Sequence, residues 1–121
     1  MLEALYNDTL DTLDLTNSEV GDAVILQICE FLRCSKVRAV KFIRCKLTDD
    51  VVNKIIPAMG NIITLNLSQN YLTDAVLGRL ASRREAMPAL KTVILCQNKI
   101  IERKHRASIE RLRQTDLIVS V

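Results

Sequence analysis

Few side chains in this sequence are suited to catalysis or metal binding, and they are widely spaced. The cysteines form no Cys-x-x-Cys pair: they are Cys29, Cys34, Cys45 and Cys96. His105 is the single imidazole that could share a metal ion with them or act as their general base. We therefore expect no metal site and no cofactor. Reduced thiols in a cytoplasmic protein fit this pattern better than a disulfide framework.

The other arrangements that support catalysis are missing as well. Asp11 and Asp14 fall on a presumed exposed strand, where water solvates both carboxylates, so they do not form a convincing acid pair. The three glycines are far apart and form no phosphate-binding loop. His105 falls on the presumed buried stripe of a helix, which favours packing over catalysis. We therefore do not expect an enzyme.

Length and composition favour one small soluble domain. The chain has 121 residues, of which 49% are hydrophobic, and this is enough to close a single core. Its apolar runs are far shorter than the roughly 18 residues that cross a bilayer, so no membrane span is expected. A secretory signal begins with a basic segment and a long apolar stretch, and Met1 is followed by neither, so we do not expect such a signal here.

Four segments of the chain share one pattern of apolar residues. They start at Leu10, Val37, Ile62 and Leu90, and each has an aliphatic or aromatic residue at unit positions one, four, six and eleven. Position nine holds Ser18, Cys45, Asn70 and Asn98. A truncated fifth unit follows, in which Leu117 and Val119 are predicted at positions four and six. An internal repeat of this length indicates stacked units that share a core.

The pattern LxxLxLxxNxL resembles the leucine-rich repeat. The starts lie 37 − 10 = 27, 62 − 37 = 25 and 90 − 62 = 28 residues apart, and these spacings are similar to those of the ribonuclease-inhibitor-like subtype. The resemblance implies an α/β solenoid with parallel strands on a concave face and helices on a convex face. It predicts one domain over 1–121, with four full repeats and a terminal strand at 116–121. Residues 1–9 fit either an N-terminal cap or a preceding helix.

Each unit contains the elements needed to position its side chains. Positions four and six point inward from a short strand, and the residues between them point outward. Helical stripes follow in 24–32, 51–59, 76–80 and, more thinly, 101–112, with cap or turn residues Gly21, Thr48 and Thr73 before the first three. Position nine lies where the strand ends and backbone groups need partners. There we expect Cys45, Asn70 and Asn98 to link successive turns.

The outward positions of the strands form the candidate binding surface. We expect a protein partner to dock there, with cations anchoring charge and apolar side chains burying area. Position five forms the central column, and Ile118 joins this column if the terminal strand forms. The candidate residues at positions five, seven and eight are Asp14, Lys41, Ile43, Arg44, Asn66, Gln69, Ile94 and Cys96. The alternative is that these are ordinary solvated strand residues.

The charges of the two ends have opposite signs. Residues 1–32 hold no bases and seven acids, 0 − 7 = −7, whereas residues 79–113 hold ten bases and three acids, 10 − 3 = +7. The competing hypothesis is therefore an assembly subunit that associates with itself or a neighbour through its ends. The bases that suggest nucleic-acid or membrane binding are Lys99, Arg103, Lys104, Arg106, Arg111 and Arg113. Their helical spacing spreads them around the helix, which favours a solvated outer helix over binding to either.

Overall fold

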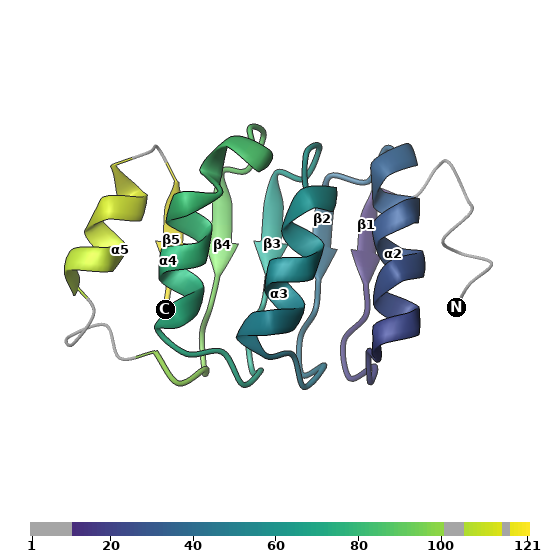
Figure 1. Ribbon diagram of the computed structural model, residues 1–121, viewed down its shortest axis with the longest axis horizontal. Helices are drawn as coiled ribbons and strands as arrows, with labels where there is room; N and C mark the ends of the chain where they lie inside the picture. The colour runs from purple at the N-terminus through teal and green to yellow at the C-terminus, as the bar shows by residue number, and fades with distance from the viewer. Residues whose placement is uncertain (1–10, 101–105, 115–116) are drawn as a thin grey trace.

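The computed structural model describes residues 11–100, 106–114 and 117–121, and its core is a parallel sheet. The strands are β1 (Thr12–Asp14), β2 (Ala39–Lys41), β3 (Thr64–Asn66), β4 (Thr92–Ile94) and β5 (Ile118–Ser120). They lie side by side in chain order, and every neighbouring pair is parallel (Figure 1). The order of strands and helices predicted from the repeat is confirmed. The predictions for residues 1–9 and for His105 lie outside the described residues.

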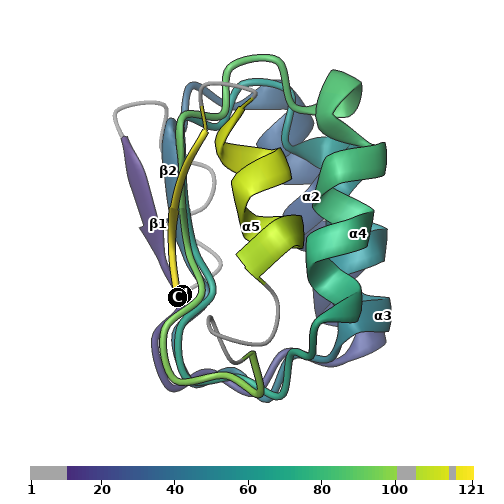
Figure 2. The ribbon, with the colours of Figure 1, turned by 90° about the vertical axis from the view of Figure 1, so that its left-hand side faces the viewer.

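The helices connect consecutive strands and all cover one face of the sheet. They are α2 (Asp22–Cys34), α3 (Asp49–Ile55), α4 (Ala75–Ser82) and α5 (Arg106–Arg113), with 3₁₀ turns η1 (Ile56–Ala58) and η2 (Arg84–Ala86) after α3 and α4. Seen along the stack, the strands form one layer and the helices the other (Figure 2). Among the described residues, no helix covers the opposite face of the sheet. We call that opposite face the strand face.

The core lies between these two layers. Leu13, Val40, Leu65 and Val93 form one row across the first four strands, as the repeat predicts, and none is more than 4% exposed. Position-six residues such as Phe42 form a second buried row. The helices add apolar residues at helical spacing, which pack against these rows. Each unit therefore buries its apolar face only by stacking on its neighbours.

The terminal strand pairs two residues away from the predicted register. The prediction aligned Leu117 with Val93, but in β5 it is Val119 that pairs with Val93. Ser120 therefore continues the central column in place of Ile118. Because side chains alternate along a strand with a period of two, a slip of two residues keeps Leu117 and Val119 facing the core. The apolar pattern alone could not distinguish these two registers.

No side chain at the N-cap positions of α2 and α3 makes a capping hydrogen bond. Gly21 and Thr48 occupy these positions. Thr73 lies one residue before the N-cap of α4, and its hydroxyl accepts a hydrogen bond from the Ala75 amide at 3.3 Å. The same hydroxyl donates to Asp49 of α3, at 2.6 Å. At the start of α4, a contact with the neighbouring unit therefore adds to a local hydrogen bond.

The turn from η2 into β4 is held by an arginine. Arg84 donates from Nη1 to the Met87 carbonyl at 2.6 Å and from Nη2 to the Leu90 carbonyl at 2.7 Å. Met87 and Leu90 are both buried, so these two bonds fix the chain where it re-enters the core. Charged donors make stronger hydrogen bonds than neutral ones, which suits this role.

Candidate partner-binding face

The register of the sheet brings the position-five side chains into one row on the strand face. Asp14 pairs with Lys41, Lys41 with Asn66, Asn66 with Ile94, and Ile94 with Ser120. Asp14 and Lys41 are exposed, whereas Asn66 and Ile94 are half-buried. The row therefore changes from acid to base to amide to apolar along the stack.

Backbone hydrogen bonds extend this grid beyond the ends of the strands. The amide of Arg44 donates to the Ser68 carbonyl at 3.2 Å, and the amide of Gln69 donates to the Cys96 carbonyl at 2.9 Å. In the first unit, the Asn17 amide donates to the Ile43 carbonyl at 2.8 Å. Positions seven and eight of neighbouring units therefore lie side by side. All eight residues predicted for the binding surface lie on or directly beside the strand face.

Two units end their strands with the same local hydrogen-bond motif. The Asp14 carboxylate accepts hydrogen bonds from the amide and the hydroxyl of Thr16, and Asn66 Oδ1 accepts the equivalent pair from Ser68. Hydrogen bonds from the hydroxyl and the amide of Thr16 hold the pKa of Asp14 below its usual value of 3.8, and the nearby charge of Lys41 lowers it further. Asp14 is therefore a fixed negative charge at neutral pH, and its position is set by its own turn.

The apolar members of the face are shielded in part by their neighbours. Ile43, Ile94 and Cys96 are half-buried, and Cys96 Sγ lies 3.6 Å from the Ser120 hydroxyl of β5. Ile118 is the large apolar residue most open to water on this face, at 64% exposed. Apolar surface of this kind gains free energy when a partner covers it.

Beneath the face, the side chain of Asn70 connects two successive units. Its Oδ1 accepts hydrogen bonds from the amides of Cys45 and Leu47, at 2.9 and 3.0 Å. Its Nδ2 donates to the carbonyls of Phe42 and Leu67, at 2.7 and 2.9 Å. The residue is only 6% exposed, so these bonds satisfy backbone groups that water does not reach.

Asn98 and Cys45 hold the equivalent places in the units on either side. Asn98 Oδ1 accepts from the amides of Asn70 and Leu72, and its Nδ2 donates to Leu67, which repeats the pattern one unit further along. Cys45 Sγ donates to the Leu15 carbonyl at 3.0 Å. Burial raises the pKa of the Cys45 thiol, so it stays protonated and keeps this donor.

Sequence reasoning missed the backbone conformation of position eight. Asn17, Arg44, Gln69 and Gln97 all have a positive φ, between 56° and 65°. Only Asn17 is of a residue type that favours this left-handed region, so the sequence carries little signal for it. The repeated conformation turns the chain at the same point in every unit and directs these side chains to the rim of the face.

Sequence reasoning also missed a hollow at the carboxyl ends of the strands. It encloses about 440 Å³ and is lined by Asn17, Arg44, Lys46, Gln69, Asn70, Tyr71 and Gln97. We call it the carboxyl-edge groove. Its residues come from positions eight and ten of neighbouring units, with the position-nine side chain of Asn70 between them. Position ten lies outside the columns at positions five, seven and eight that form the predicted binding surface.

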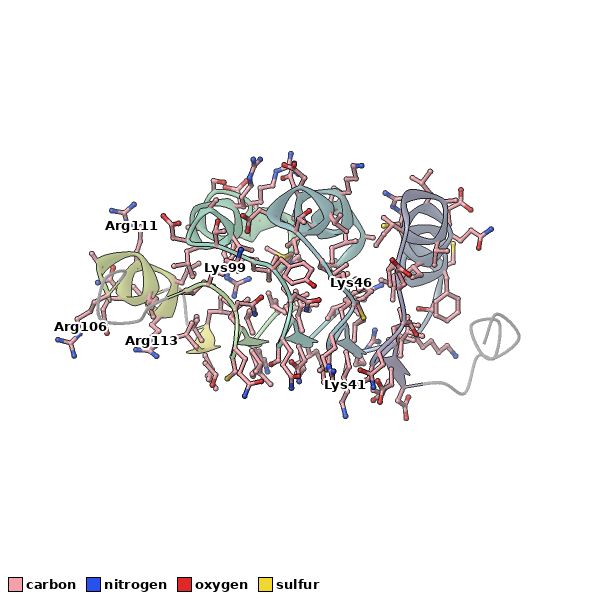
Figure 3. All side chains as sticks on the ribbon, turned by 90° about the horizontal axis from the view of Figure 1, so that it is seen from below. Lys41, Lys46, Lys99, Arg106, Arg111 and Arg113 are labelled. Carbon is pink, nitrogen blue, oxygen red and sulfur yellow. The ribbon has the colours of Figure 1, made fainter. Side chains whose placement is uncertain are left out.

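The basic residues of the fourth helix do not gather on one surface. In Figure 3, Arg106 and Arg111 point to different sides of α5. Arg113 lies 3.5 Å from the carboxylate of Glu110 and donates to the Val119 carbonyl, so it holds the helix on β5. Arg103 and Lys104 lie outside the described residues. Within the described part of α5, the cations are spread around the helix, as the sequence predicts.

The described residues contain neither a cluster of metal ligands nor a helix suited to a bilayer. No group of three histidine, cysteine or acidic side chains is placed to hold a metal ion within residues 11–100, 106–114 and 117–121. In the same ranges, no helix is both long and apolar enough to span a bilayer. The four cysteines are free thiols.

Comparison with known proteins identifies the fold and nothing finer. No family model matches the sequence, and no curated protein is similar to it by sequence. Among solved structures, the chain is similar to actin-binding site 2 of leiomodin-1, with a TM-score of 0.77 and 17% sequence identity. The similarity covers 98% of this chain and 75% of that one. Together with the parallel sheet and its one-sided helices, it shows that the chain has a leucine-rich-repeat-like fold.

Proposed function

We propose that this chain is a non-catalytic module that binds another protein on its strand face. One observation carries the proposal. The face that the described helices leave open presents an ordered row in which the exposed Lys41 and the half-buried Ile94 flank Asn66. Interfaces between proteins combine an apolar centre with a polar, charged rim, and Arg is enriched in them.

The arrangement of the face suits docking better than mere solvation. Lys41 lies on the second of the five strands and points away from the helices in Figure 3. Ile94 lies two strands away in the same row and is half-buried, so a partner could complete its burial. The buried Asn70 ties the ends of the strands that carry these side chains, so little backbone entropy is lost when a partner binds.

A matched pair of double variants tests the proposal. Lys41→Glu with Ile94→Glu alters the strand face, while Arg79→Glu with Leu26→Glu makes the same kind of change on the exposed helix layer. Proteins captured from a native lysate are compared among the wild type and both variants. We expect a subset that the face variant loses and the helix variant keeps. Identical capture by all three chains would refute docking on the strand face.

The similar structure supplies a first defined partner to test. It is an actin-binding site, and on that ground we propose actin as the first candidate for this face. Co-sedimentation with actin filaments, and anisotropy of labelled chain with monomeric actin, measure binding directly. Binding that the Lys41→Glu with Ile94→Glu variant loses supports actin as the partner. Absence of binding in both assays removes actin and leaves the lysate experiment to decide the class.

The second candidate function is assembly through the ends of the stack. The observation that favours it is Ile118, which is 64% exposed on β5, the last strand of the sheet. An open strand edge beside an exposed apolar side chain can pair with another chain. Light scattering at low and high salt tests this role. A monomer at high concentration in both conditions would refute it, whereas a dimer that Ile118→Lys dissolves would support it.

The proposal extends to the number and subtype of the repeats and to the cellular compartment of the protein. We propose four full repeats of the ribonuclease-inhibitor-like subtype forming a short solenoid, since the unit lengths of 27, 25 and 28 residues match that subtype. We also place the protein in the cytoplasm. The free thiols, among them the exposed Cys34, suit a reducing compartment.

A further inference from the structure

The carboxyl-edge groove has two walls built from different positions of the repeat. One wall is the row of position-eight residues Asn17, Arg44, Gln69 and Gln97, which share a left-handed backbone. The other wall is formed by Lys46 and Tyr71 of position ten. Glu19 and Lys99 hold position ten in the units on either side and lie outside the lining. Figure 3 looks onto this edge and places Lys46 and Lys99 between the strand and helix layers.

The groove is positively charged and rich in hydrogen-bond donors. Its lining includes Arg44 and Lys46 but no acidic residue. The closest acid in the position-ten row is Glu19, whose carboxylate lies 3.7 Å from Lys46 Nζ. Both side chains of that pair are more than 60% exposed, so water screens the contact and an incoming carboxylate can compete for Lys46. Arg44 can bind a carboxylate through two parallel hydrogen bonds.

The dimensions of the groove match a short stretch of extended chain. It crosses four units, and parallel strands are spaced about 4.8 Å apart, so it is roughly 14 Å long. An extended chain rises about 3.3 Å per residue, so about four residues fill this length. The amides of Asn17, Gln69 and Gln97 can both donate to and accept from a peptide backbone. The exposed ring of Tyr71 offers an apolar surface for one of its side chains.

We propose that the carboxyl-edge groove binds an extended acidic segment of a protein partner, with one carboxylate held between Arg44 and Lys46. The proposal rests on the proposed function, because it assigns a particular contact to the same partner. A shallow groove lined mostly by exposed side chains fits a strand-like segment better than an enclosed small molecule. The acidic group lies toward the centre of the groove, since Glu19 repels it from the first unit.

A labelled hexaglutamate peptide tests the groove directly in fluorescence anisotropy, with hexaglutamine as the neutral probe. The test variant is Arg44→Gln with Lys46→Gln. Glutamine already occupies position eight in the next two units at a φ of 59°. Arg44 and Lys46 have φ values of 56° and 59°, so the backbone tolerates glutamine at both sites. The control variant, Arg79→Gln with Lys91→Gln, removes the same charge from exposed sites elsewhere. Circular dichroism confirms that both variants are folded.

We expect hexaglutamate to bind the wild type and the control variant equally, and to bind the test variant at least about tenfold more weakly, as the loss of a charge-assisted hydrogen bond requires. Hexaglutamine should bind about tenfold more weakly than hexaglutamate. Equal weakening in both variants would reveal general charge attraction and overturn the proposal. Displacement of hexaglutamate by an equal concentration of inorganic phosphate would also overturn it, since the site would then take small anions.

The strand-face variant separates this inference from the proposed function. Lys41 and Ile94 do not line the groove, so the Lys41→Glu with Ile94→Glu chain should bind hexaglutamate within about threefold of the wild type if the groove is the site. If this variant loses protein capture but still binds hexaglutamate, the captured proteins depend on the strand face and the peptide does not. Loss of hexaglutamate binding in this variant would place the peptide on the strand face and overturn the groove proposal.

Discussion

Replacing Asn70 by alanine tests how the units are held together. The substitution removes the acceptor of the Cys45 and Leu47 amides, which lie 2.9 and 3.0 Å from it. It also removes the donor to the carbonyls of Phe42 and Leu67. Asn70 is 6% exposed, so water cannot replace these bonds without opening the structure.

The size of the effect follows from the two orphaned amides. A buried donor left without a partner costs about 1 to 3 kcal/mol, so the pair costs about 2 to 6 kcal/mol. A domain of this size is stable by about 5 to 15 kcal/mol. Asn70→Ala should therefore remove a large part of the free energy of unfolding. Asn98→Ala should cost less, because Asn98 is only half-buried and water can reach the groups it leaves.

Urea unfolding followed by far-ultraviolet circular dichroism measures this loss as a change in the extrapolated free energy. Asn61, in the exposed turn before β3, provides the matched control, and Asn61→Ala should change stability by no more than about 0.5 kcal/mol. A cost below about 1 kcal/mol for Asn70→Ala would refute the reasoning. The stack would then depend on apolar contact alone, and the hydrogen-bond ladder would be incidental.

Three further outcomes are expected. Arg84→Met should lower the free energy of unfolding by about 1 to 3 kcal/mol through two lost charged hydrogen bonds, and urea titration should show almost no change for the neighbouring, exposed Arg83→Met. Exposed Cys34 should react with a thiol reagent at neutral pH at least about tenfold faster than Cys45, whose pKa is raised by burial; mass spectrometry that finds equal rates would contradict this placement. Hydrogen bonds lower the pKa of Asp14 below its unfolded value, so its stabilising contribution is complete above about pH 4 and is lost as the pH falls through the folded pKa. Asp14→Asn should therefore reduce the loss of stability in acid, and an unchanged pH profile would contradict the assignment.

The repeat in the sequence predicted most of the sheet. Leu13, Val40, Leu65 and Val93 were expected on adjacent parallel strands, and they pair in that order. The reason is physical: alternating apolar residues followed by a helical stripe can be buried only if consecutive units stack in parallel. The same pattern assigned the eight candidate residues to the open side of the sheet. Whether a partner uses them stays a prediction.

The sequence by itself determined which side chains face the core, because the period of two along each strand leaves one choice per unit. Only the tertiary structure decided how units slide and turn relative to one another. It placed Ser120 rather than Ile118 in the central column, since registers two residues apart bury the same side chains. It also brought Arg44, Lys46 and Tyr71 into one groove. Their closeness depends on a left-handed turn that the residue types of most units do not signal. It depends as well on the stacking of units 25 residues or more apart in the chain.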